Sequence, residues 1–217
     1  MLNRFTFGPR PGDAEAVMKM GPDAWFERQL NPDSIPDPIL DKRLADYPSL
    51  YLPPNQLLVE FPSNQVIRQV ADGKRSEPPE VTLDGAYDVL IAKYNKQKAM
   101  QGAVQPDMTD DQKAAQRKQE QAAAAVLADE VLAFPKAERM QAIMKMPVEQ
   151  RMTLTEFVTD PQRGLLFNDF SPRDKETFNL MAGGPDGMHV IDGELQQLKV
   201  LRAILSERQL QEVMTDF

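Results

Sequence analysis

The pattern that decides the fold lies in residues 194–217, which read ELQQLKVLRAILSERQLQEVMTDF. One helical face of the first part holds Leu195, Leu198, Leu201, Ile204 and Leu205. Apolar residues then recur at helical spacing at Leu210, Val213, Met214 and Phe217. At about 100° per residue, the second stripe lies about 140° around the axis from the first. This predicts a helix ending near Leu205 and a new helix after Ser206, with Ser206 and Gln209 at capping-box spacing. The alternative is one continuous helix buried on both faces.

Short helices are also predicted at the other end of the chain. Asp13 suits the N-cap of a helix over residues 14–20, and Gly21 suits the left-handed position that follows a helix. Pro22 then opens a second helix, which ends at Asn31-Pro32.

Residues 31–64 are rich in proline. Seven prolines between residues 31 and 64 exclude long helices and predict a segment that wraps over a helical core. In this segment, residues 39–47 and 55–61 are expected to form short helices, and residues 50–52 are extended at best. The composition of residues 72–84 predicts a loop before a helix over residues 86–100.

A long polar helix is expected in the middle of the chain. Thr109 and Gln112 have the spacing of a capping box, and residues 112–132 are rich in strong helix formers. Residues 112–125 lack large apolar side chains, so this part should project or lie on the surface. Further helices are predicted over residues 135–145, 147–158 (closed by Asp160-Pro161) and 172–181, with Ser171 as an N-cap. Residues 182–193 read as a glycine-rich loop.

The sequence therefore predicts an all-α fold. We expect an irregular multi-helix body with Pro-rich wrapping segments and a long Ala/Gln-rich surface or projecting helix. Three parts are predicted: residues 1–71 with the helix-turn-helix and the wrap, residues 72–134 as an insertion with the polar helix, and residues 135–217 as the C-terminal helical part.

Composition narrows the possible functions. The 217 residues include no Cys and one His, which excludes disulfides, thiolate metal sites and any site that needs two imidazoles. The net charge of -8 argues against a nucleic-acid partner, because phosphate binding needs a basic surface. No apolar run is long enough to span a membrane.

Few residues have the pattern of a chemical site. His189 lies near Asp186, Asp192 and Glu194, a combination that can form a general base, although a His that caps a backbone group has the same pattern. Asp107, Asp110 and Asp111 could meet a cation but also suit a helix N-terminus. Asp33, Asp37 and Asp41 are interpreted as turn residues. No catalytic residue, cofactor or metal ligand is assigned.

Two stretches carry a resemblance to a known family. Residues 2–13 read LNRFTFGPRPGD and residues 20–30 read MGPDAWFERQL. Together with KVLRAILSERQLQEVMTDF at residues 199–217, they resemble the N-terminal part of the bacterial domain of unknown function 1800 family. The middle of the chain, roughly residues 31–190, resembles the variable insertion of some members. The resemblance implies a longer, mostly helical, exported parent and no agreed activity.

Three functional hypotheses follow. In the first, the chain is a structural or interaction part that packs on a missing C-terminal part of the same polypeptide. In the second, it is an accessory part of an extracytoplasmic, hydrolase-like enzyme. In the third, it is a carrier or partner-binding module that uses its polar helix. The stripe of Leu210, Val213, Met214 and Phe217 ends with the chain, so we expect a fragment that self-associates through it. The family resemblance implies a periplasmic or secreted location.

Overall fold

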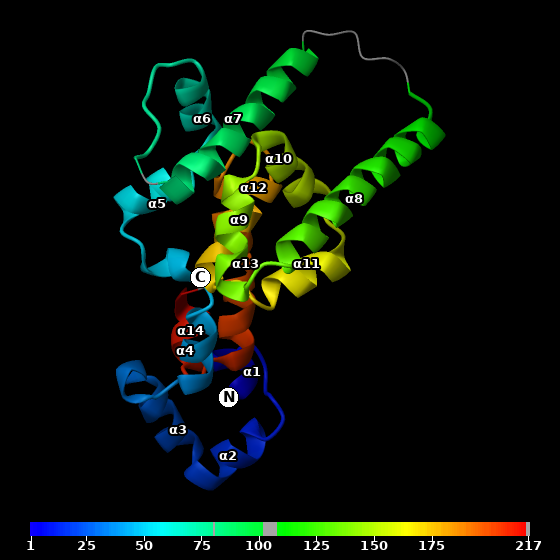
Figure 1. Cartoon of the computed structure of the whole chain (residues 1–217). Coiled ribbons are helices and arrows are strands. Elements are labelled where there is room, and N and C mark those ends of the chain that lie inside the picture. The colour runs from blue at the N-terminus through cyan, green and yellow to red at the C-terminus, as the bar shows by residue number, and fades with distance from the viewer. Residues whose placement is uncertain (80, 102–107, 216–217) are drawn as a thin grey trace. The chain divides into compact units, whose positions relative to one another are not determined.

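A computed structural model describes residues 1–79, 81–101 and 108–215. The described residues form helices and no strand, which confirms the all-α class. The α-helices are α1 (Leu2–Phe5), α2 (Asp13–Met20), α3 (Pro22–Gln29), α4 (Pro38–Leu44), α5 (Pro54–Glu60), α6 (Asn64–Ala71), α7 (Val81–Gln101), α8 (Asp110–Leu132), α9 (Arg139–Lys145), α10 (Val148–Phe157), α11 (Asp160–Phe167), α12 (Pro172–Ala182), α13 (Met188–Leu205) and α14 (Gln209–Thr215) (Figure 1). Three short 3-10 helices are η1 (Pro32–Ser34), η2 (Pro48–Tyr51) and η3 (Lys136–Glu138).

The chain forms two compact units. Unit 1 consists of residues 1–47 together with residues 193–217, and unit 2 consists of residues 48–192. Both ends of the sequence thus belong to one unit, whereas the three predicted parts are continuous in sequence. No helix among the described residues has the length and apolar character needed to cross a bilayer.

The core of unit 2 is built around α7 and α10. Helix α10 packs against α7, α8 and α12, and α6 packs along α7 (Figure 1). The centre of this core is fully enclosed; its largest buried side chains include Tyr87, Phe61, Phe178, Leu90, Ile143 and Leu154. Phe167, Phe170 and Phe178 meet ring to ring at 5.5 to 6.0 Å, as expected for apolar side chains gathered around α11 and α12.

Helix α7 begins earlier than predicted. It starts at Val81, so residues 81–84 are helical and Gly85 lies inside the helix. A Cβ atom at Gly85 would lie 2.8 Å from Arg151 Nη1 and 2.5 Å from Met144 Cε. The ends of the Met144 and Arg151 side chains, from α9 and α10, therefore occupy the space that a Cβ atom at Gly85 would take.

Helix α8 begins with the predicted capping box. Gln112 N donates to Thr109 Oγ1, and Thr109 N donates to Gln112 Oε1. Residues 110–119 are exposed, while Ala124, Leu127, Ala128 and Val131 are buried where α8 packs on α10 and α11. The predicted polar half thus lies on the surface of unit 2, and the apolar half anchors the helix.

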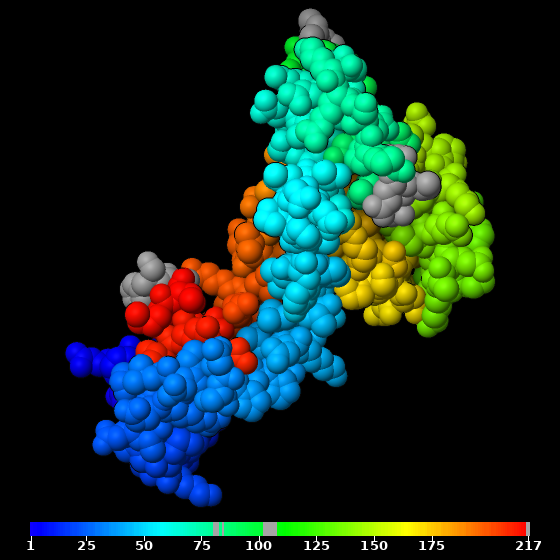
Figure 2. All heavy atoms as spheres, turned by 90° about the vertical axis from the view of Figure 1, so that its left-hand side faces the viewer, coloured from blue at the N-terminus to red at the C-terminus, as the bar shows by residue number. Residues whose placement is uncertain are grey.

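The Pro-rich segment of unit 2 lies on its surface. Figure 2 shows residues 48–71, coloured cyan to teal, along one face of this unit. Phe61 is 1% exposed and anchors the segment in the core. Residues 48–51 form η2 instead of an extended stretch, because Ser49 N is held by the buried Glu176 carboxylate at 2.8 Å.

Three further local expectations were wrong, and one helix was missed. Asp160-Pro161 opens α11 instead of closing α10, since proline is tolerated in a first helical turn. Asp13 is the first residue of α2, after Gly12 at a φ of 90°, because its carboxylate accepts from Arg10 N at 2.8 Å. The glycine-rich loop ends at Gly187, because α13 already begins at Met188. Helix α6 was not predicted, although its apolar residues lie on one face.

Unit 1 is built around the predicted break in the C-terminal pattern. Helix α13 ends at Leu205 and α14 begins at Gln209, so the alternative of one continuous helix is wrong. The predicted capping box of Ser206 and Gln209 is wrong, because the Ser206 hydroxyl accepts from Arg208 N at 3.0 Å instead of from Gln209 N, and it donates to Asp37 Oδ2 at 2.8 Å. Gln209 turns its amide back onto Ala203 O and Ser206 O. The hydroxyl therefore joins the break to a distant carboxylate.

The pKa of the Tyr87 hydroxyl reports on the packing of unit 2. Its side chain is 2% exposed and its hydroxyl donates to Val59 O at 2.7 Å. Burial raises the pKa of Tyr87 to about 12. Because the unfolded chain loses this proton near pH 10, the stabilisation from Tyr87 is complete below about pH 10 and is lost as the pH rises through about 12.

We expect an ultraviolet titration of the folded chain to show a late tyrosinate step that Tyr87→Phe removes. Tyr51→Phe is the control, because Tyr51 is 68% exposed, and it should leave the late step in place. A late step of unchanged size in Tyr87→Phe would contradict the burial of this hydroxyl.

Candidate functional site

The loop between α12 and α13 carries the single histidine. Its residues 183–187 read GGPDG, and His189 follows in the first turn of α13. The imidazole Nδ1 lies 2.5 Å from Asp186 O, and Nε2 lies 3.1 Å from Asn179 O. A neutral imidazole can donate to one of these carbonyls and the imidazolium to both. Both partners are main-chain oxygens, so His189 joins the end of α12 to the start of α13.

This geometry differs from that of a general base. A general base presents a nitrogen lone pair to its substrate, whereas both nitrogens of His189 face backbone oxygens. The Asp186 carboxylate accepts from Met188 N at 3.0 Å and so caps α13 instead of orienting the imidazole.

Two glycines of the loop are needed for close packing. A Cβ atom at Gly183 would lie 2.1 Å from His189 Cε1, although the φ of -78° at this position suits any residue. A Cβ atom at Gly187 would lie 3.0 Å from the backbone carbon of Phe61, and Gly187 N donates to Pro62 O at 2.7 Å. The glycines therefore let the loop fit between His189 and the Pro-rich segment.

Lys93 is a buried cation beside the same loop. Its side chain comes from α7 and is 8% exposed. Its ammonium group donates to Met181 O at 2.6 Å and to Gly183 O at 2.7 Å, so it caps the C-terminus of α12. Burial lowers the pKa of Lys93, and the negative charge of Glu156 acts in the opposite direction.

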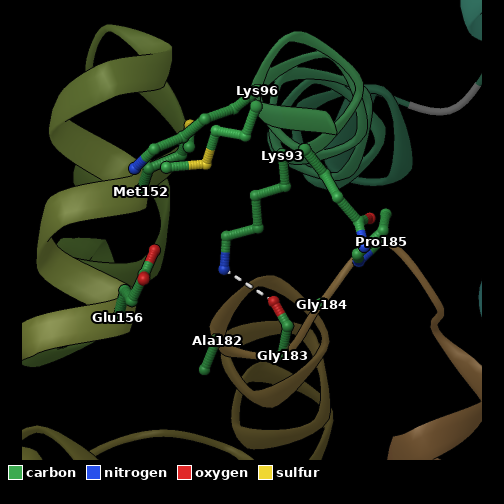
Figure 3. A pocket seen from close by; sticks show the side chains of 10 residues that line it. Lys93, Lys96, Met152, Glu156, Ala182, Gly183, Gly184 and Pro185 are labelled. Atoms are coloured by element: carbon green, nitrogen blue, oxygen red, sulfur yellow. Dashed lines mark hydrogen bonds between the residues drawn. The ribbon is translucent and has the colours of Figure 1, made fainter. Parts of the chain in front are cut away.

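A pocket of about 490 Å³ opens next to Lys93. Figure 3 shows Lys93 between Met152 and Glu156 of α10 on one side and Gly184 and Pro185 of the loop on the other. The remaining lining residues are Lys96, Gln97, Met100, Ala182 and Gly183. Sequence reasoning missed this pocket, because Lys93 and Lys96 read as ordinary polar positions of a helix.

The acidic candidates do not form a metal centre in the described residues. Asp107 lies outside them, while Asp110 and Asp111 are exposed in the first turn of α8. The Asp110 side chain is fully exposed, and its Oδ1 lies 3.9 Å from Lys113 Nζ. Within residues 1–79, 81–101 and 108–215, no three His, Asp or Glu side chains come together as metal ligands could.

Asp37 has a role that the sequence did not predict. This residue is 2% exposed, and its Oδ2 accepts from Ser206 Oγ and from Glu207 N. The side chain thus bonds the break between α13 and α14 instead of serving a local turn. A partial signal is present in the sequence, since Asp before a proline is typical of a helix start, but the distant partner has no such signal.

The position of Gly183 leads to a prediction about the loop. Gly183→Ala should cost about 1–2 kcal/mol of stability, because the added methyl group displaces the imidazole from its two carbonyl partners. In a His189→Ala background the same change should cost less than about 0.5 kcal/mol, since the clash is gone. Chemical denaturation of the four chains measures this difference.

Gly184→Ala is the matched control. No atom lies within 4 Å of a Cβ at Gly184, so this change should leave stability nearly unaltered in both backgrounds. An equal cost of Gly183→Ala with and without His189 would show that the two residues are not coupled.

Comparison with known proteins identifies the family. Neither the comparison with curated proteins nor that with solved structures found a match. The family described as protein of unknown function (DUF1800) matches residues 1–217. The match thus includes the middle of the chain, beyond the two ends that showed the resemblance. Because it covers every residue, the chain belongs to the DUF1800 family.

Proposed function

We propose that this chain is the helical N-terminal part of a larger exported bacterial protein, in which it has a structural or interaction role. The main support is that buried polar side chains make hydrogen bonds to the main chain of other segments. Lys93 caps α12, while Arg139 donates to Leu132 O and Phe134 O at the end of α8. The Glu176 carboxylate accepts a hydrogen bond from Ser49 N at 2.8 Å. Such bonds between helices fix the positions of the helices relative to one another.

An exposed apolar face on α13 supports an interaction role. Val200 and Ile204 are each 56% exposed and lie four residues apart, so they are neighbours on one side of the helix. Covering valine and isoleucine side chains of this exposure with a partner lowers the free energy. We propose that further helical chain of the same polypeptide covers this face.

Self-association through the C-terminal stripe has less support. Leu210 is 9% exposed in unit 1, where α14 packs on α1 and α3, and Val213 is half-buried. Phe217 lies outside the described residues, so Met214 is the exposed member of the described part of the stripe. A second copy therefore has fewer apolar side chains to bind than the sequence pattern suggested.

The alternative role as an accessory part of an enzyme calls for a different arrangement. It would be favoured by a pocket that joined His189 to two carboxylates. Of the residues that line the pocket beside Lys93, Glu156 supplies one carboxylate, and His189 faces main-chain oxygens. The structural role accounts for more of the polar contacts.

The proposal can be tested in the cell that makes this chain. An antibody raised against residues 1–217 should detect a polypeptide clearly larger than 24.5 kDa, and osmotic shock or the culture medium should release it. A cytosolic marker protein controls for lysis. A band of 24.5 kDa that stays with the cytosolic marker would contradict the proposal.

Photo-crosslinking tests the proposed partner of α13. A photo-reactive amino acid in place of Ile204 should crosslink within one polypeptide, to residues outside 1–217. The same amino acid in place of the exposed Gln116 on α8 is the control and should give much less product. Crosslinks from position 204 that join two copies, or none above the control, would exclude the proposed packing.

A further inference from the structure

We infer that the pocket beside Lys93 binds a small organic monocarboxylate that carries an apolar chain. This inference is independent of the proposed structural role. It rests on three features of the pocket: the buried Lys93 ammonium group with one N–H donor left over, the net charge of the lining residues, and the apolar residues among them.

Lys93 keeps one donor for a ligand. An ammonium group has three N–H bonds, and those to Met181 O and Gly183 O use two of them. The side chain is 8% exposed and its amine borders the pocket, so the third donor meets water or a ligand there (Figure 3). A buried cation with an unused donor is a strong partner for a carboxylate oxygen.

The charges of the lining select the ligand. Lys93 and Lys96 contribute two positive charges and Glu156 contributes one negative charge, which leaves one net positive charge. This balance favours a monoanion over a dianion such as a phosphate monoester. The whole chain has a net charge of -8, so a cationic pocket is not a general property of its surface.

The other residues of the pocket select an apolar body. Met100, Met152, Ala182 and Pro185 line it beside the charged groups. Methionine side chains adapt their shape to apolar ligands. The volume of about 490 Å³ is in the range of small-molecule sites, so a short alkyl chain fits beside the carboxylate.

The solvation of Lys93 also favours a carboxylate here. Burial lowers the pKa of Lys93 by removing water from its charged form. The groups that face it are two carbonyl oxygens, Glu156 and Lys96. A bound carboxylate would replace the missing water with a negative charge and would stabilise the charged amine.

Hexanoate is a suitable probe, and methyl-labelled methionine is a suitable reporter. Hexanoate should shift the NMR signals of Met100 and Met152, identified from Met100→Leu and Met152→Leu variants, with a Kd on the order of 1–10 mM. Hexanol has the same alkyl length and no charge, so it should bind at least about five-fold more weakly.

Two lysines of the same helix give a matched pair of variants. Lys96→Gln removes an exposed charge from the pocket and should weaken hexanoate binding about three-fold or more. Lys98→Gln makes the same charge change outside the pocket, where Lys98 lies 3.5 Å from Asp72, and should leave the affinity unchanged. Lys93→Met should abolish binding if it folds, and the Lys96 and Lys98 pair decides the question if it does not.

Other results would overturn the inference. Equal binding of hexanol and hexanoate would show an apolar surface without anion selectivity. An equal loss in Lys96→Gln and Lys98→Gln would show a general charge effect. The absence of saturable shifts at either methionine up to about 50 mM hexanoate would show that the pocket does not bind carboxylates.

Discussion

The fold of unit 1 depends on hydrogen bonds to the backbone at the break between α13 and α14. Three side chains make these bonds: Arg10, Gln29 and Asp37. A break between two helices leaves carbonyl and amide groups without helical partners. Arg10 Nη1 lies 3.2 to 3.4 Å from the carbonyl oxygens of residues 204–206. Gln29 donates to Glu207 O at 2.9 Å and accepts from Leu210 N at 3.1 Å. Asp37 accepts from Glu207 N at 2.9 Å.

These bonds explain why the two ends of the sequence form one unit. The partners come from the turn before α2, from α3 and from the turn before α4 on one side, and from the α13–α14 break on the other, about 170 to 200 positions away in sequence. Gln29 and Asp37 are nearly fully buried, so removing either would leave unsatisfied backbone groups away from water. Apolar packing alone would hold α14 less specifically, because it does not fix which residues meet.

The sequence predicted features that depend on neighbouring residues. Helical periodicity predicted the break after Leu205. The Thr109 cap was recognised from Gln112 three positions on, and the Ser171 cap from the adjacent Pro172. It did not predict the partners of Asp37 and Lys93, because their side chains bond atoms that are distant in the sequence. The early start of α7 was missed as well: residues 81–84 are helical, and beside Gly85 the side chains of Arg151 and Met144 from other helices lie against α7.

Amide hydrogen exchange at the α13–α14 break, measured by NMR, tests whether these side chains hold the break. We expect protected amides at Glu207 and Leu210 in the unchanged chain. Gln29→Ala should release the Leu210 amide, Asp37→Ala should release the Glu207 amide, and Asp33→Ala should release neither. Unprotected amides in the unchanged chain, or a Leu210 amide that stays protected in Gln29→Ala, would show that these side chains do not hold the break.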